Sequence, residues 1–245
     1  DEVTTISSNA FYNCTGLTGL KLGEKVTMID DYAFQNCKNV VGELVIPDSV
    51  ETIDNYAFYS MSGLTSIVFG SGLTRMYSNP LYGCSGIREV TFTGTTAPTM
   101  TDSIFSSMSK LESVTVPAEG YGSYANAIGT NLPTKHRLRC SDNSDDLVII
   151  DGVLVAYQGN AEMVEIPEGV TAIGNGAFQN CTKVISVEIP DTVTEIGSYA
   201  FSYLDNLTSV EVPASVTQVA SNAFHSFEGT VPCNVLFLGD APAIS

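Results

Sequence analysis

Two histidines and six cysteines are the side chains in this sequence most able to act as metal ligands, acid–base groups or nucleophiles. His136 and His225 lie far apart in the chain, and neither falls at zinc-site spacing from a pair of cysteines. No serine, histidine and acidic residue recur in a pattern that suggests a catalytic triad, although a triad is defined by geometry and not by order. The sequence therefore predicts no catalytic, cofactor-binding or metal-binding residues.

Two segments leave a calcium site or an enzyme site as an alternative. Residues 142–146 offer carboxylate and amide oxygens to a calcium ion but lack the glycine and the closing glutamate of an EF-hand loop, so we expect a solvated loop. Residues 118–146 contain Tyr121, Tyr124 and His136, whose side chains can act as acid–base groups in an enzyme site. Their spacing demands no chemistry, and we expect a non-enzymatic protein.

The chain is strongly acidic, with 27 Asp and Glu against 10 Lys and Arg and a formal net charge of −17. A surface of this sign repels phosphate backbones and anionic lipid heads, so neither nucleic acid nor direct membrane insertion is expected. No apolar run reaches the length of about 18 residues that spans a bilayer. Residues 135–139 are the exception, because they hold three of the ten basic residues and one of the two histidines.

A short repeat organises these residues. An Ala-Phe pair, or a weaker equivalent at Leu81 and Phe105, returns every 23 or 24 residues. We call the second residue of each pair the anchor. The anchors are Phe11, Phe34, Phe58, Leu81, Phe105, Phe178, Phe201 and Phe224. A period of this length is typical of a solenoid, in which each repeat is one coil stacked on its neighbours.

The middle of the chain carries the same period in weaker form. Phe105 and Phe178 are 73 residues apart, which is close to three further periods. Ala127-Ile128 and Val153-Leu154 fall near the expected anchor positions. We therefore expect one solenoid over residues 1–245 with about ten coils, degenerate over 118–150 and incomplete over 1–6.

Each coil has the same internal order. An L-x-x-L-x-L segment such as Val184 to Ile189 alternates apolar residues as a strand does, and Pro or Gly follows it. A V-x-x-I segment then predicts a second short strand, and a helix-capping residue such as Asp30 or Asp54 leads into a single helical turn that holds the anchor. The sequence thus predicts an α/β repeat solenoid. It is a right-handed, leucine-rich-repeat-like stack with a parallel β-sheet on one face, and short strands and helical turns on the other.

The repeat L-x-x-V-x-I-P-x-x-V-T-x-I-G-x-x-A-F-x-x-C resembles that of BspA-type leucine-rich repeat proteins. Residues 192–201 carry it most clearly. Residues 150–157, with Asp-Gly-Val-Leu, and residues 237–242 match further parts of the family pattern. The resemblance implies a bacterial, secreted or surface-attached protein of the adhesin or host-interaction kind, with no catalytic residues.

The register assigns most of the cysteines to the core. Four of them fall three residues after an anchor, namely Cys14, Cys37, Cys84 and Cys181. Other coils place Met61, Met108, Leu204 and Phe227 there, which indicates a buried apolar position. Cys140 takes an inward strand position, and Cys233 has no repeat role. We expect buried thiols; disulfides, with Cys14 and Cys37 on adjacent coils, or a metal site are the alternative.

The register also sorts the residues that point outward from the main sheet. We call the middle outward position of each strand the outward column. It runs through Lys21, Val45, Val68, Thr91, Thr115, Arg139, Glu165, Glu188 and Glu211. Glutamates on successive strands repel one another, and Arg139 beside Glu165 would offset this at one end. The candidate partner-binding residues are therefore Lys135, Arg137, Arg139, Glu165, Glu188 and Glu211. The alternative is a solvated face with one surface ion pair.

Two functions fit these expectations. The first is a monomeric, non-enzymatic extracellular binding or adhesion module, which uses the exposed face of the repeat sheet to bind a protein or glycan partner. A host protein or glycoprotein is among the partners expected. The second is a passive spacer within a larger surface protein. Because the chain opens inside a coil, we expect upstream residues, a signal segment among them, to have been removed.

Overall fold

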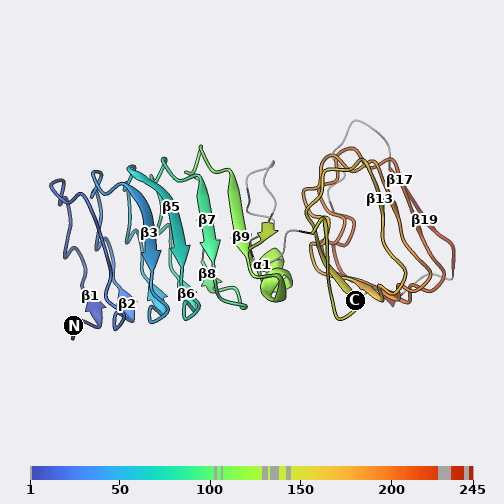
Figure 1. The fold of residues 1–245 in the computed structure, drawn as a ribbon, viewed down its shortest axis with the longest axis horizontal. Coiled ribbons are helices and arrows are strands. Elements are labelled where there is room, and N and C mark those ends of the chain that lie inside the picture. The colour runs from blue at the N-terminus through green and yellow to red at the C-terminus, as the bar shows by residue number, and fades with distance from the viewer. Residues whose placement is uncertain are drawn as a thin grey trace. The chain divides into compact units, whose positions relative to one another are not determined.

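The computed structural model describes residues 2–101, 104–105, 107–128, 132, 138–141, 145–225, 233–239 and 243–244. They form two compact units. Unit 1 comprises Asp1–Gly120 and Asn131–Leu138, and unit 2 comprises Tyr121–Thr130 and Arg139–Ser245. Both are stacks of coils (Figure 1), and over the described part of the chain the coils number about nine. The predicted solenoid with parallel sheets is confirmed, whereas its continuity from residue 1 to 245 stays a prediction.

Unit 1 builds two parallel sheets from successive coils. The first contains β1 (Thr5–Ile6), β2 (Met28–Ile29), β4 (Thr52–Ile53), β6 (Arg75–Met76) and β8 (Thr99–Met100). The second contains β3 (Gly42–Ile46), β5 (Leu64–Phe69), β7 (Glu89–Phe92) and β9 (Ser113–Val116), which lie side by side in Figure 1. The register pairs Val45 with Val68, Val68 with Thr91 and Thr91 with Thr115. This part of the outward column is thus confirmed.

The third side of each coil is a run of tight turns where a helical turn was expected. Tyr32 and Asn36 have left-handed φ values of 55° and 61°, which no α-helix of L-residues accepts. The Ala33 N–H donates to Asp30 O within the turn at 3.2 Å, while the Phe34 N–H donates to Ala57 O of the next coil at 2.7 Å. Alternate N–H groups therefore bond within the coil and between coils.

The anchors pack on one another through the core. Within unit 1, ring centroids lie 5.0 Å apart between Phe11 and Phe34 and 5.7 Å apart between Phe34 and Phe58. In unit 2, Phe201 lies 5.2 Å from both Phe178 and Phe224. The alanines that precede Phe34, Phe58, Phe178 and Phe201 are themselves fully buried. Since each coil buries its ring against the next, no coil is stable alone.

Unit 2 contains a β-hairpin. β11 (Leu147–Ile150) runs antiparallel to β12 (Val153–Tyr157), joined by Asp151 and Gly152 with φ values of 50° and 77°. Positive φ at both central residues is the requirement of a type I′ turn, and Asp-Gly meets it. β12 then pairs in parallel with β14 (Ala172–Ile173), followed by β16 (Glu195–Ile196), β18 (Gln218–Val219) and β20 (Ala243–Ile244).

The second sheet of unit 2 has the order β13 (Met163–Glu165), β15 (Ser186–Glu188), β17 (Ser209–Val212) and β19 (Asn234–Phe237). Its strands are parallel and one coil apart. β10 (Leu138–Cys140) holds the residues at which the chain passes from unit 1 to unit 2.

Two expectations for the middle of the chain were wrong in detail. Ala127-Ile128 lies in an α-helix, α1 (Tyr121–Ile128), which follows a 3₁₀ turn at Ala118–Gly120. Val153-Leu154 is not an anchor pair, because Leu154 pairs with Ile173. The ring that packs against Phe178 is that of Tyr157, with centroids 5.3 Å apart and the ring planes tilted by 33°. Ala156-Tyr157 is therefore the true Ala-aromatic pair of that coil.

Candidate functional site

The outward face of β13, β15 and β17 carries a row of glutamates. Period-two alternation turns Val164, Val187 and Val210 into the core and leaves the next residue of each strand exposed. Those exposed residues are Glu165, Glu188 and Glu211. The register places Glu165 opposite Glu188, and Glu211 opposite Leu236 of β19. This part of the predicted outward column is confirmed.

Among the described residues, these glutamates form no ion pair that would offset their charge. Parallel strands lie about 4.8 Å apart, so like charges directly opposite one another destabilise the sheet. The ion pairs of the described residues join Lys25 to Glu2 and Arg88 to Glu112, both on the surface of unit 1. The cost of the glutamate row is thus not relieved by those pairs.

The predicted pairing of Arg139 with Glu165 is wrong. Arg139 is exposed on β10, but the sheet that holds Glu165 begins at β13 and continues only toward β15. The reason is the β11–β12 hairpin, which occupies the chain between these strands in place of a regular coil. Lys135 and Arg137, the other basic candidates, lie outside the described residues.

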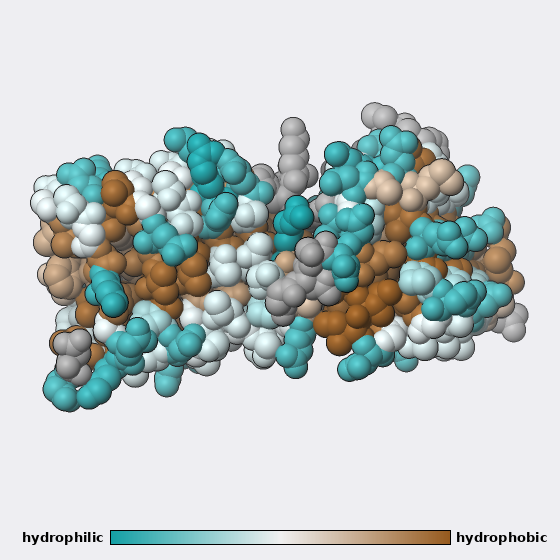
Figure 2. Space-filling model, viewed as in Figure 1, coloured by the Kyte–Doolittle hydropathy of each residue, from teal (hydrophilic) through white to brown (hydrophobic). Residues whose placement is uncertain are grey.

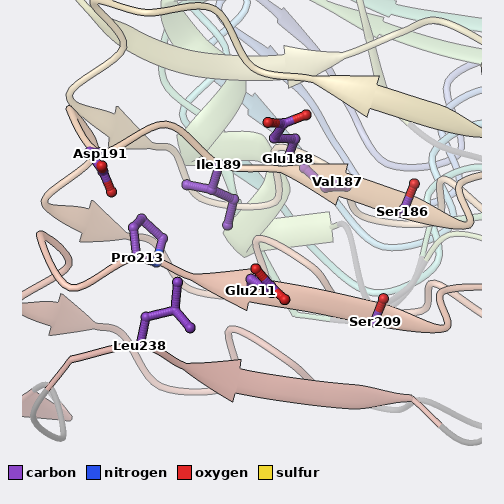
Figure 3. Close-up of a pocket in the computed structure, with 9 residues that line it drawn as sticks. All are labelled: Ser186, Val187, Glu188, Ile189, Asp191, Ser209, Glu211, Pro213 and Leu238. Carbon is purple, nitrogen blue, oxygen red and sulfur yellow. The ribbon is translucent and has the colours of Figure 1, made fainter.

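A shallow hollow of about 360 Å³ lies on this face (Figure 3). It is lined by Ser186, Val187, Glu188, Ile189, Asp191, Ser209, Glu211, Pro213 and Leu238. The residues come from three successive coils, so only stacking creates the hollow. Two candidate residues from the sequence, Glu188 and Glu211, lie in its wall, and Glu165 lies one strand away.

The polar side chains that line the hollow are all hydrogen-bond acceptors, and none is cationic. The lining offers three carboxylates and two hydroxyls, all able to accept hydrogen bonds, and it includes no histidine, lysine, arginine or cysteine. The lining therefore holds no histidine or lysine that could activate either serine as a nucleophile. The arrangement suits reversible binding of a cationic or hydrogen-bond-donating group.

The outward face of unit 1 is different in character. Val41 and Val45 are 66% and 52% exposed, and Val45 continues into Val68 and two threonines along the outward column. Figure 2 shows apolar side chains exposed over β3 and β5 in this view. The two units thus present sheets of unlike chemistry, and the acidic one belongs to unit 2.

Three of the four cysteines at the repeat position are buried as predicted, whereas Cys14 of the first coil is half-buried. Cys37, Cys84 and Cys181 are buried three residues after an anchor, and so are Met61 and Leu204 in other coils. The thiols of these cysteines also donate hydrogen bonds, which the thioether of a methionine cannot do. The Cys37 thiol donates to Phe11 O and the Cys84 thiol donates to Phe58 O, each at 3.1 Å. Each thus joins its own coil to the anchor backbone of the preceding coil. No disulfide links the six cysteines.

Cys84 is expected to resist alkylation in the folded protein. Burial raises the pKa of its thiol to about 12, so almost no thiolate exists at pH 8. Iodoacetamide labelling followed by peptide mass spectrometry should modify half-buried Cys14 at least tenfold faster, and urea should abolish the difference. Equal native labelling of the two, or an intact mass two units lower per pair of thiols, would contradict this assignment.

One acidic cluster was missed by sequence reasoning. Carboxylate oxygens of Asp30, Asp31 and Asp54 lie within 4.8 Å of one another in unit 1. Burial raises the pKa of Asp54, and the charges of Asp31 and Asp30 add to the shift, against the lowering effect of the Asn55 N–H. The signal was present as aspartate after V-x-x-I in consecutive coils, but it was interpreted as helix capping.

A row of tyrosines was also missed. Tyr32 stacks on Tyr56 at 5.4 Å, Tyr59 stacks on Tyr82 at 5.7 Å, and Tyr56 meets Tyr59 edge-on at 5.8 Å. Tyr32 and Tyr56 hold left-handed φ values that favour asparagine or glycine. Because the rings of successive coils stack, the row contributes coil-to-coil packing.

Comparison with known proteins identifies the repeat. The model of the BspA type leucine rich repeat region matches residues 4–128 and 150–231, with six copies. No curated protein sequence gives a significant match. Within the described residues, no helix combines the length and the apolar character needed to cross a membrane.

Several solved structures are similar to the chain. A leucine-rich cell surface protein of Faecalibacterium prausnitzii is 21% identical, with 97% of this chain and 77% of that one covered and a TM-score of 0.42. A leucine-rich repeat protein of Eubacterium ventriosum is 16% identical, with 96% and 70% covered and a TM-score of 0.41. The pneumococcal vaccine antigen PcpA is 16% identical, with 95% and 72% covered and a TM-score of 0.39. With its repeats matched over most of its length, the chain belongs to the BspA-type leucine-rich repeat family.

Proposed function

We propose that this protein is a non-enzymatic binding or adhesion module displayed outside the cell, which binds a protein or glycoprotein through the exposed face of β13, β15, β17 and β19. The observation that carries the proposal is the hollow at Glu188 and Glu211, where carboxylates line an outward sheet face with no basic residue among them. Solenoids use such extended surfaces for binding. The leucine-rich repeat fold of the family is typically non-enzymatic.

The test measures binding to a defined panel of purified extracellular-matrix and serum glycoproteins by biolayer interferometry. The face variant carries Glu165→Lys, Glu188→Lys and Glu211→Lys. We expect it to bind its partner at least tenfold more weakly, about 1.4 kcal/mol, because each attraction becomes a repulsion. The matched control carries Glu168→Lys, Glu195→Lys and Asp205→Lys, which changes the net charge equally at exposed positions of unit 2 outside this sheet.

The competing function is a passive spacer, which binds nothing. It predicts that no member of the panel binds and that deleting coils only shortens the molecule. Equal loss of binding in the face variant and in the control would show that overall charge, and not this face, governs attachment. A partner that binds both variants as tightly as the wild type would place the site elsewhere.

A further inference from the structure

The three carboxylates of the hollow come from two successive coils. Glu188 and Asp191 come from β15 and the turn that follows it, and Glu211 comes from β17. Across the described residues, the three-carboxylate group close enough to hold a metal ion is Asp30, Asp31 and Asp54. The carboxylates of the hollow are spread more widely than that. Their spacing therefore suits a cation larger than a bare metal ion.

Apolar side chains complete the wall. Ile189 is 8% exposed and Pro213 is buried, while Leu238, just past the end of β19, is 56% exposed. Figure 3 shows Pro213 and Leu238 at one end of the lining and Ser186 and Ser209 at the other. An aliphatic stem gains free energy against Leu238 and Pro213 while a charged head reaches the carboxylates. The hollow thus fits a cation that carries an apolar stem.

Arginine matches this arrangement better than lysine does. A guanidinium is planar and holds five N–H donors in a fixed fork, so it can bridge carboxylates on two adjacent strands about 4.8 Å apart. An ammonium is a compact point charge that serves one carboxylate well. The hydroxyls of Ser186 and Ser209 accept the remaining donors.

The acidic surface continues beyond the hollow. Glu165 lies opposite Glu188 on the next strand, outside the lining. A volume of about 360 Å³ lies at the low end of the range for ligand pockets, roughly 300–1,000 Å³, which suits the insertion of one side chain. Charge complementarity then favours a second basic residue of the same partner at Glu165. An extended segment laid across the strands meets both positions.

We infer that the hollow binds an arginine side chain from an extended basic segment of a partner protein, with Glu188 and Glu211 bridging its guanidinium and Leu238 contacting its stem. This rests on the proposed function and adds the chemistry of the partner. The carboxylate row costs stability in the unbound protein, and the arriving guanidinium relieves that cost.

The experiment uses fluorescence polarisation with a labelled peptide of alternating arginine and glycine. Peptides of alternating lysine and glycine, and of aspartate and glycine, are its comparisons. The wild-type protein should bind the arginine peptide most tightly and the aspartate peptide not at all. Glu188→Gln with Glu211→Gln should weaken arginine-peptide binding about tenfold, because two charge pairs are lost together.

The matched control is Glu43→Gln with Glu89→Gln, which removes two exposed strand glutamates of unit 1. It should change binding less than twofold. If both double variants weakened peptide binding equally, the binding would depend on the net charge of −17 and not on the hollow, and the inference would be overturned. Competition by calcium chloride at constant ionic strength would assign the carboxylates to a metal and overturn it too.

The experiments distinguish failure of this inference from failure of the proposed function. If the arginine peptide fails to bind while the face variant still loses a protein or glycoprotein of the panel, the sheet face binds a partner of other chemistry. If the panel and the peptide both fail to bind, the spacer function replaces both proposals.

Discussion

Replacing Phe58 with alanine is expected to lower the free energy of unfolding by about 3–5 kcal/mol. The Phe58 side chain is 0% exposed and its ring stacks on Phe34 at 5.7 Å. Its backbone also links coils, since the Phe58 N–H donates to Pro80 O and Phe58 O accepts from the Cys84 thiol. The cavity would open between two coils, where the backbone bonds prevent collapse.

Phe11 provides the matched control, because it occupies the same repeat position in the first coil. It is 37% exposed and stacks on Phe34 at 5.0 Å. Phe11→Ala should cost roughly 1–2 kcal/mol, since less apolar area leaves water on folding. Urea unfolding followed by circular dichroism measures both, with fluorescence of the native tyrosines as a second probe of cooperativity. Equal losses for Phe58 and Phe11 would mean that the anchors do not carry the stack.

The spacing of the anchors predicted the stack of coils because the same core contacts recur once in every repeat. A ring at Phe34 or Phe58 must lie on the ring of the next coil, and the position of Cys37 must then be buried. The turns could not be predicted in the same way. An Ala-Phe-x-x-Cys spacing fits a helical turn as well as it fits the observed turns. The left-handed φ of 55° at Tyr32 runs against the preference of tyrosine.

The middle of the chain shows why register fails where local signals compete. Asp151-Gly152 is a strong two-residue hairpin signal, and the coil that follows this hairpin has its anchor at Tyr157, 21 residues before Phe178. Counting a fixed period placed Leu154 there instead. The same hairpin separates Arg139 from Glu165, so the error in fold became an error in the candidate site.

The acidic half of that site could be predicted and the apolar half could not. Glu165, Glu188 and Glu211 occupy one repeat position, so the register alone aligned them. Pro213 and Leu238 also share one repeat position on successive coils, directly after β17 and β19, because the register pairs Val212 with Phe237. Their approach to Glu188 depends on the depth of each turn, which the repeat pattern does not encode.

Gly72→Ala should be the most damaging of the small substitutions, with a loss of about 2–3 kcal/mol. Gly72 follows β5 in the turn that stacks on the preceding coil, and a Cβ there would overlap the carbonyl oxygen of Asp48. That neighbour is backbone and is itself held, since the Asp48 carboxylate accepts from the Ser71 N–H at 2.7 Å and hydroxyl at 3.0 Å. The clash must therefore be relieved by separating two coils.

Gly19→Ala separates this steric effect from the general preference of glycine. A Cβ at Gly19 meets nothing within 4 Å, so alanine there should leave the urea midpoint unchanged or raise it slightly by restricting the unfolded chain. The Gly72 variant should unfold at lower urea with an unchanged slope, because coil separation weakens the native state without altering the surface exposed. Coincident unfolding curves for the two variants would show that the coils tolerate local separation. The coil-to-coil spacing would then not be what fixes the register of the stack.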